Sequence, residues 1–349
     1  MKEKRELCHK TSIGIIIIVL FGLFSTQATA ASFDCKKAAS WLEKNVCSNP
    51  ELSKLDEQMA KAYSDALKSL SPEGQKETKQ YQKQWLKEIQ HKKAEEELDL
   101  KKWLKELPHI KAKAEHKGYK DNLNKIIATD LELVYQIRIT QLKRILIKFP
   151  DRIFRHVYVS RHSETDKSCP RLFEDQKLTY LQIENPRDEN EKSWNNLISK
   201  EAFDHFGASD KCQDNNDEYT VTFSNKHLIS VKHTHNWWDT STDEDRGEQT
   251  QGYFETKCIS WLLEDKRELK ASDLFNDKTD WQNKIVALVA QKVTRSSELT
   301  NIITSPSLWE ISKNGLHYLF SDYGAPVITI DWKTLDPYLS KNGRSLIFE

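Results

Sequence analysis

Residues Phe33–Tyr63 read FDCKKAASWLEKNVCSNPELSKLDEQMAKAY, and they combine a pair of cysteines with the start of a regular helix. Asn49 can accept hydrogen bonds from the free amides of a first helical turn. Pro50 suits the first helical position, and Glu51 is favoured near the positive end of the helix dipole. The sequence therefore predicts a helix with a defined start at this point.

Apolar residues continue beyond this start at spacings of three and four. They are Leu52, Leu55, Met59, Ala62, Tyr63 and Ala66. This spacing predicts one apolar stripe along an amphipathic helix. The helix must bury that stripe, so it needs a packing partner elsewhere in the chain.

The same segment resembles the LprI-like lysozyme-inhibitor domain of exported bacterial proteins, over about residues 33–107. Its matching positions are Phe33, Cys35, Ala38, Glu43, Cys47, Leu52, Leu55-Asp56 and Tyr63. Trp85-Leu86 matches the second helix of the family, whereas Ile89 and Lys93 stand where the family has an Arg and, in some members, a Cys. The resemblance implies an exported helical domain with a connection to lysozyme.

The first thirty residues have the pattern of a signal peptide. Met1–Ser12 carries four basic residues, Ile13–Phe24 is apolar, and Ala28-Thr29-Ala30 is a small-x-small cleavage site. The apolar core is too short to cross about 30 Å of hydrocarbon as a helix. We therefore expect residues 1–30 to be removed and the mature chain to be periplasmic or extracellular, with membrane contact only through the leader before cleavage.

Export places the remaining cysteines in an oxidising compartment. Cys35 and Cys47 form the best pair, because closing the loop between them is worth roughly 3 kcal/mol in the chain-entropy model. One continuous helix would hold the two sulfurs about 18 Å apart, so we expect coil from Cys35 to about Ala38. Cys169 and Cys212, both in polar turn-like settings, could form a second disulfide and leave Cys258 as a buried thiol.

The mature chain exceeds the usual size of a single hydrophobic core, which predicts two domains, at residues 31–149 and 150–349. Charge divides in the same way. Residues 31–150 hold 24 Lys and Arg against 18 Asp and Glu, whereas residues 151–349 hold 25 against 33. The net charge of +0 over the whole chain hides this division.

The basic part has the pattern of three or four antiparallel helices. A turn is predicted at Ser71–Gly74, a Lys- and Glu-rich helix from Gln75 to about Leu107, and a helix with an apolar face over Leu123–Ile147. The lysine-rich faces could bind an anionic polymer. A solvated helix surface is the favoured interpretation, since the charges of both signs are interspersed.

From Phe149-Pro150 onward the pattern changes to strands. Alternating or β-rich runs occur at residues 153–159, 178–183, 219–223, 228–234, 252–262, 316–320 and 327–331, and helical patterns at 191–205 and 279–293. Strands mixed with a few helices, without regular alternation, predict an α+β fold with an antiparallel sheet.

Residues of about 150–349 also resemble the extracellular module of RsiV-type anti-sigma factors. The matching order runs through Tyr219-x-Val221-x-Phe223, Leu228–Val231, Gly252-Tyr253-Phe254, Asp273-Leu274-Phe275, Leu308-Trp309-x-Ile311, Gly315–Phe320, Tyr323 and Val327–Ile330. In anti-sigma factors this module binds lysozyme. The resemblance therefore implies a lysozyme connection for the second half as well.

Signatures of catalysis are missing from the sequence: it has no Gly-x-Ser-x-Gly elbow, P-loop, dinucleotide fingerprint or His-Glu-x-x-His helix. We therefore expect no enzyme, no cofactor and no nucleic-acid partner. His233 and His235 could share a metal with Asp239, since side chains two apart on a strand face one side. Without further ligands at a suitable spacing, surface histidines are the favoured interpretation, and no metal site is predicted.

The segment after these histidines joins aromatic and acidic residues. The candidate partner-binding residues are Trp237, Trp238, Asp239, Asp243, Glu244 and Asp245. Two adjacent tryptophans on a strand cannot both point into one core, so at least one should lie near the surface. Acidic charge with an aromatic anchor suits a cationic protein partner. The alternative is an ordinary hairpin loop whose Trp side chains pack on the sheet.

Together these patterns favour an exported, non-enzymatic protein that recognises or inhibits lysozyme-type muramidases and protects the cell envelope. The alternative is an accessory protein that binds peptidoglycan or another envelope polymer through its basic helices and an exposed Trp. An enzyme with unmarked carboxylate chemistry is a third, less favoured class.

Overall fold

The computed structural model describes residues 31–106, 129–164, 173–206, 213–239, 242–243, 247–248, 251–291, 299–319 and 327–349. The candidate cysteines Cys169 and Cys212 and the residues Glu244 and Asp245 lie outside these ranges. Among the described residues, no helix is both long enough and apolar enough to cross a bilayer.

The N-terminal part is helical. It comprises the short 3-10 helix η1 (Cys35–Lys37), α2 (Trp41–Ser48), α3 (Pro50–Ser69), α4 (Pro72–Glu106) and a further helix over residues 129–143. A capping box at Ser40 and Glu43 opens α2. Asn49 opens α3 by accepting the amides of Glu51 and Leu52 at 2.9 and 3.3 Å, as its sequence predicts.

The central sheet has seven strands in the order β1-β2-β3-β4-β5-β8-β9. The strands are β1 (Leu146–Lys148), β2 (Ile153–Glu164), β3 (Phe173–Ile183), β4 (Gln213–Ser224), β5 (Leu228–Asp239), β8 (Gln251–Leu262) and β9 (Arg267–Glu268). Helix α6 (Glu189–His205) lies between β3 and β4 in the chain. The small hairpin of β6 (Thr242–Asp243) and β7 (Gly247–Glu248) lies between β5 and β8 in the chain.

The C-terminal part consists of short helices and strands. They are α7 (Ala271–Leu274), α8 (Trp281–Ala290), α9 (Leu299–Thr304), η2 (Pro306–Leu308), β10 (Trp309–Ile311), β11 (Gly315–Tyr318), β12 (Ile328–Asp331), α10 (Trp332–Leu335), η3 (Asp336–Tyr338) and α11 (Lys341–Phe348). Strands β10, β11 and β12 form an antiparallel three-stranded sheet.

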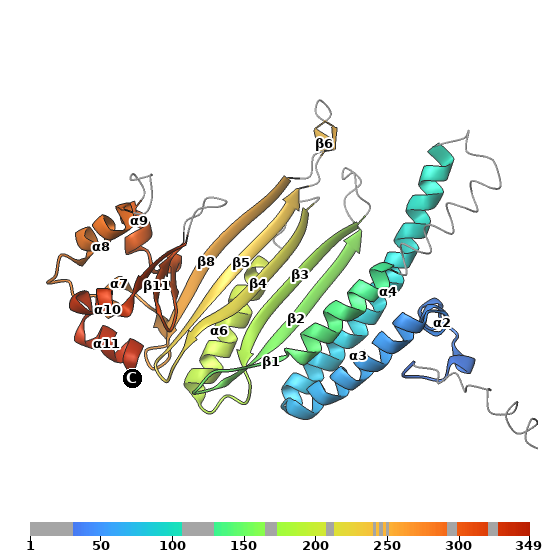
Figure 1. Ribbon diagram of the computed structural model, residues 1–349, viewed down its shortest axis with the longest axis horizontal. Coiled ribbons are helices and arrows are strands. Elements are labelled where there is room, and N and C mark those ends of the chain that lie inside the picture. The colour runs from blue at the N-terminus through green and yellow to red at the C-terminus, as the bar shows by residue number, and fades with distance from the viewer. Residues whose placement is uncertain are drawn as a thin grey trace, which may run out of the picture.

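Figure 1 shows how these parts are arranged: α2, α3 and α4 lie beside the β1–β2 edge, α6 covers one face of the central sheet, and the C-terminal elements lie beside β8. Trp194 and Ile198 of α6 are fully buried in the core that α6 forms with the sheet. The predicted α+β class, with a helical N-terminal part, is confirmed.

Three local predictions differ from the structure. Pro72 is the first residue of α4, so the turn predicted at Ser71–Gly74 is shorter than expected. Leu146–Lys148 forms strand β1 and pairs with β2, where the end of a helix was predicted. The sheet also contains one parallel pair, β3 with β4, although its other pairs are antiparallel as predicted.

Cys35 and Cys47 form the predicted disulfide. The chain reverses between them because η1 ends at Lys37 and α2 starts only at Trp41. The coil expected from Cys35 to about Ala38 was wrong, because Cys35–Lys37 forms a short 3-10 helix in which Asp34 caps the amide of Lys36. Cys258 is a free, buried thiol, as predicted, and burial raises its pKa. The pairing of Cys169 with Cys212 stays a prediction.

Removal of the Cys35–Cys47 disulfide should weaken the helical part. We expect the Cys35→Ala, Cys47→Ala double variant to lose roughly 3 kcal/mol of unfolding free energy, because the unfolded chain regains the entropy of an open loop. Urea unfolding followed by circular dichroism measures this loss. Lys44→Ala, an exposed change within the same loop, serves as the control. A double variant as stable as that control would contradict the expectation.

A buried ion-pair cluster joins the helical part to the sheet. Arg155 of β2 has a side chain only 2% exposed and lies 2.8 Å from Glu77 of α4 and 3.1 Å from Glu184. Glu184, equally buried, also accepts a hydrogen bond from the Ser71 amide at the start of α4. The helices are therefore tied to the sheet by specific polar contacts. The division at residue 150 stays a prediction.

Candidate functional site

Strand β5 ends, and its neighbours β4 and β8 begin, at the same end of the central sheet. We call this region the strand-end surface, and it comprises residues 213–218 of β4, 235–239 of β5 and 251–255 of β8. Their pairing sets Asn215, Trp237 and Tyr253 in one row across the strands. Asp217, His235 and Glu255 form the next row. Residues directly opposite in antiparallel strands share a face, so each row lies on one face of the sheet.

The strand-end surface is acidic. Its three segments contain Asp214, Asp217, Glu218, Asp239 and Glu255 and no Lys or Arg. Glu218 and Glu255 are exposed and Asp214 is partly exposed. Lys177, which is exposed on the adjacent strand β3, lies opposite Asn216 in the parallel pairing of β3 with β4. The segment sequence and the strand register together concentrate negative charge here.

Aromatic rings connect this surface to the interior. Trp237 is partly buried and stacks between His235 and Tyr253, with ring centroids 4.7 and 5.1 Å away. Tyr253 is 37% exposed and Phe254, next in the chain, is 45% exposed. At the inner end, Tyr219 stacks on His233 with a centroid distance of 4.1 Å. Apolar ring surface of Trp237 and Tyr253 is thus available on the face that carries Glu255, whereas Phe254, Asp214 and Glu218 belong to the opposite face of the sheet.

The structure describes only some of the predicted partner-binding residues. Trp237 is at the surface end of the aromatic row, as the adjacent-tryptophan argument requires of at least one ring. Trp238 and Asp239 belong to the end of β5, and Asp243 belongs to β6. Their backbones are described and their side chains are not. The role of these residues in binding stays a prediction.

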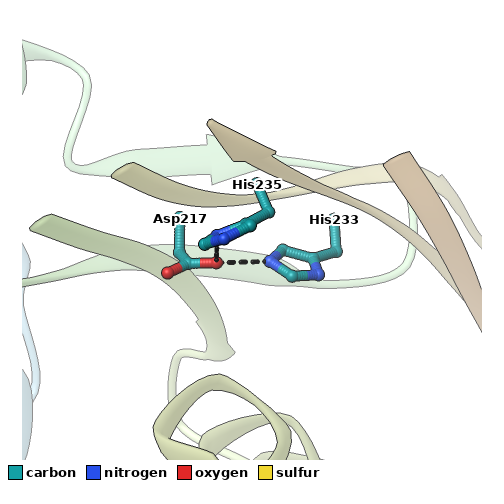
Figure 2. Close-up of side chains that lie close together, drawn as sticks. All are labelled: Asp217, His233 and His235. Atoms are coloured by element: carbon teal, nitrogen blue, oxygen red, sulfur yellow. Dashed lines mark hydrogen bonds and ion pairs between the residues drawn. The ribbon is translucent and has the colours of Figure 1, made fainter. Parts of the chain in front are cut away.

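The two histidines predicted to share a strand face converge on a carboxylate from the neighbouring strand. Oδ1 of Asp217 lies 2.7 Å from Nε2 of His233 and 2.9 Å from Nδ1 of His235. Figure 2 shows the carboxylate of Asp217 between the two rings, with one oxygen joined to both. The exposed fractions of the side chains are 1% for Asp217, 4% for His233 and 24% for His235.

The electrostatics of Asp217 follow from these contacts. Burial acts to raise the pKa of its carboxyl group, but the hydrogen bonds with His233 and His235 outweigh burial and lower the pKa from 3.8 to about 2. Asp217 is therefore a carboxylate at neutral pH. Its second oxygen, Oδ2, is buried and has no hydrogen-bond partner among the described residues.

The backbone of Asp239, considered in the sequence as the carboxylate nearest the histidines, lies away from this cluster. It lies four residues beyond His235 along β5, or about 13 Å at the rise of a strand, and pairs with Gln213 and Gln251. Asp217 takes that position because β4 runs antiparallel to β5 and sets Asp217 directly opposite His235. The sequence analysis missed Asp217.

The helical part holds an open groove of about 660 Å³ between α3 and the segment over residues 142–148. Its lining combines apolar side chains, among them Ala62, Leu142 and Ile145, with Lys61, Lys143 and Lys148. Asp65, also in the lining, lies 2.9 Å from the amine of Lys61. The groove therefore offers basic groups of the kind that the polymer-binding alternative needs.

Solved structures that resemble this chain over part of its length include two DUF3298 family proteins. No family model and no curated protein matches the chain. A member of the DUF3298 family from Bacteroides fragilis has a TM-score of 0.38 and 15% identity, over 54% of this chain and 94% of that one. A DUF3298 family protein from Pseudomonas aeruginosa has a TM-score of 0.37 and 9% identity, over 54% and 95%.

Proposed function

We propose that this chain is an exported, non-enzymatic protein that binds and inhibits lysozyme-type muramidases, and that the strand-end surface makes the contact. The observation that carries the proposal is the strand-end surface itself, whose three segments hold the exposed Glu218 and Glu255 and the partly exposed Asp214, no Lys or Arg, and the stack of Trp237 on Tyr253. Lysozymes are cationic enzymes, so they carry the opposite charge.

The two features of the surface have different physical roles. Exposed carboxylates such as Glu218 and Glu255 steer a cationic partner and raise the rate of association. A ring that loses its remaining exposure in the complex supplies most of the affinity, because interface free energy concentrates in a few aromatic anchors. Trp237 is held in place by stacking on both sides, so little side-chain entropy is lost when it binds.

Two observations support export. The first is the leader pattern in residues 1–30, with its basic start, apolar core and small-x-small site. The second is the Cys35–Cys47 disulfide, since such bonds persist in oxidising compartments and are rare in the cytosol. An inhibitor of wall-degrading enzymes would act in such a compartment.

The proposal is tested with purified residues 31–349 and a c-type lysozyme. Muramidase activity should fall at low ionic strength and recover as salt shortens the Debye length from about 10 Å at 0.1 M to about 3 Å at 1 M. The Trp237→Ala, Trp238→Ala double variant should weaken inhibition by about 30-fold, the effect of losing a hot spot worth about 2 kcal/mol.

The matched control for this assay is Phe348→Ala, because Phe348 is an aromatic residue of α11, 58% exposed and far from the strand-end surface. It should inhibit as well as the unaltered chain. Unaltered muramidase activity at every salt concentration, with no complex detected, rejects the proposal.

The alternative function is binding of peptidoglycan or another anionic envelope polymer. The groove beside α3, with Lys61, Lys143 and Lys148 in its lining, favours this alternative. Sedimentation of the mature chain with insoluble peptidoglycan distinguishes the two. Binding that is lost in the Lys143→Glu, Lys148→Glu variant, together with unaltered lysozyme activity, would favour the polymer.

A further inference from the structure

Asp217, His233 and His235 form a group of three potential metal ligands that the proposed inhibitor function does not require. One carboxylate oxygen and one nitrogen from each ring lie within 4.8 Å of one another. Carboxylate oxygen and imidazole nitrogen are both ligands for zinc and related divalent transition metals. The donor set therefore fits such an ion by its chemistry.

The sheet fixes these three groups before any ligand binds. His233 and His235 are two apart on β5 and so share a face, and Asp217 lies directly opposite His235 on β4. Stacking on Tyr219 fixes one ring, and stacking on Trp237 fixes the other. Ligands held on paired strands lose little conformational entropy when a metal binds.

Asp217 has coordination capacity beyond its two hydrogen bonds. Both imidazoles meet the same oxygen, whereas the buried Oδ2 has no partner among the described residues. A buried polar atom without a partner is costly and needs an explanation. A cation bound at this carboxylate supplies one.

The distances need only a small change to admit a metal. The oxygen-to-nitrogen separations are 2.7 and 2.9 Å, whereas ligands at about 2.0–2.1 Å from a tetrahedral zinc lie about 3.3 Å apart. Each of these two separations must therefore grow by about half an ångström. His235 is 24% exposed, so an ion can enter from its side, and a water or a partner group can take the fourth position.

The surrounding charges are mixed. Glu255 lies opposite His235 and adds a carboxylate to the row, although it stands outside the close group of three. Lys257 lies opposite His233, and its amine is 3.8 Å from Glu201 of α6, which offsets its charge. Because Glu201 offsets Lys257 and Glu255 adds a carboxylate, the neighbouring charges do not oppose a cation.

We propose that Asp217, His233 and His235 bind one divalent transition metal ion, with zinc as the representative case. The site lies at the inner border of the strand-end surface, next to Trp237. Its test is independent of lysozyme binding, because the measurement of metal binding involves no second protein.

The test uses the untagged mature chain and zinc in competition with a chromogenic chelator. One equivalent of zinc should bind to the unaltered chain. Asp217→Asn, which keeps the shape of the side chain, and His235→Ala, at the most exposed of the three positions, should each weaken binding by at least tenfold. His227→Ala is the control, since His227 faces Glu264 at 3.4 Å at the opposite end of the β4–β5 hairpin.

A second readout does not depend on the stability of the Asp217→Asn and His235→Ala variants. Copper(II) bound at the site should quench the fluorescence of Trp237, whose ring is 4.7 Å from that of His235. Trp237→Phe should remove the quenched component and leave zinc binding unchanged. Absence of a one-to-one zinc complex in the unaltered chain would overturn the proposal, and so would a zinc affinity that Asp217→Asn and His235→Ala leave within twofold of the control.

Discussion

Replacement of Arg155 by methionine should lower the unfolding free energy by about 3–5 kcal/mol, the usual cost of removing one partner from a buried ion pair. The guanidinium lies 3.1 Å from Glu184, whose side chain is only 2% exposed, and 2.8 Å from Glu77. Methionine fills much of the volume but leaves the Glu184 carboxylate buried without its cation. The loss should therefore come from charge, with little contribution from packing.

Urea unfolding followed by both circular dichroism and tryptophan fluorescence measures this loss and reports on domain coupling at the same time. The control is Arg344→Met, because Arg344 is exposed and pairs with the exposed Asp336, a contact worth less than about 1 kcal/mol. If Arg155 couples the helices to the sheet, its loss should also separate the unfolding transition followed by circular dichroism from the one followed by tryptophan fluorescence. An Arg155→Met variant as stable as the control would contradict this.

Trp309→Ala should cost a similar amount, about 3–5 kcal/mol, because it empties the centre of the C-terminal core. Trp309 is fully buried, and its ring lies 5.6 Å from that of Phe275 and 6.4 Å from that of Trp281. Its indole N–H also donates to the carbonyl of Ile302 at 3.2 Å. The substitution therefore removes packing and leaves a buried carbonyl without its donor.

Thermal unfolding by calorimetry measures the effect of Trp309→Ala. Val327→Ala is the matched control, since Val327 precedes β12 in the same part of the chain but is 56% exposed. The control should keep the unfolding temperature of the unaltered chain. A Trp309→Ala variant that does so as well would show that this core does not stabilise the fold.

Local signals in the sequence were sufficient for much of the fold. The start of α3 depends on Asn49 and Pro50, which act within one helical turn, and the structure has the helix there. The disulfide depends on a short chain separation and also forms as predicted. Alternating apolar residues located the main strands because burial on one face of a sheet imposes a period of two.

Long-range register was not accessible in the same way. A β-bulge between Val221 and Phe223 shifts the pairing of β4 with β5, and this shift decides that Asp217 meets His235. A change of one residue moves every side chain to the other face. No local pattern reports such a bulge, so the carboxylate of the cluster could not be identified from the sequence.

The same limit explains why the segment just before Phe149 was predicted as the end of a helix but forms a strand. Leu146–Lys148 has apolar residues that continue the helical spacing, yet it pairs with Ile153–Arg155 as β1. Hydrogen bonding to the edge of β2 outweighs the intrinsic preference for helix, because tertiary context overrides propensity. The parallel pairing of β3 with β4 likewise follows from the crossover through α6.

The proposed contact at the strand-end surface is tested most directly by hydroxyl-radical footprinting of the mature chain with and without c-type lysozyme at low salt. Tyr253 is exposed and readily oxidised, and it should be protected in the complex together with Trp237, with which it shares a face of the sheet. Phe348 and Leu133, more than half exposed elsewhere on the molecule, should be oxidised equally in both states. Unchanged oxidation of Trp237 and Tyr253 under conditions where the enzyme is bound would contradict the proposed interface.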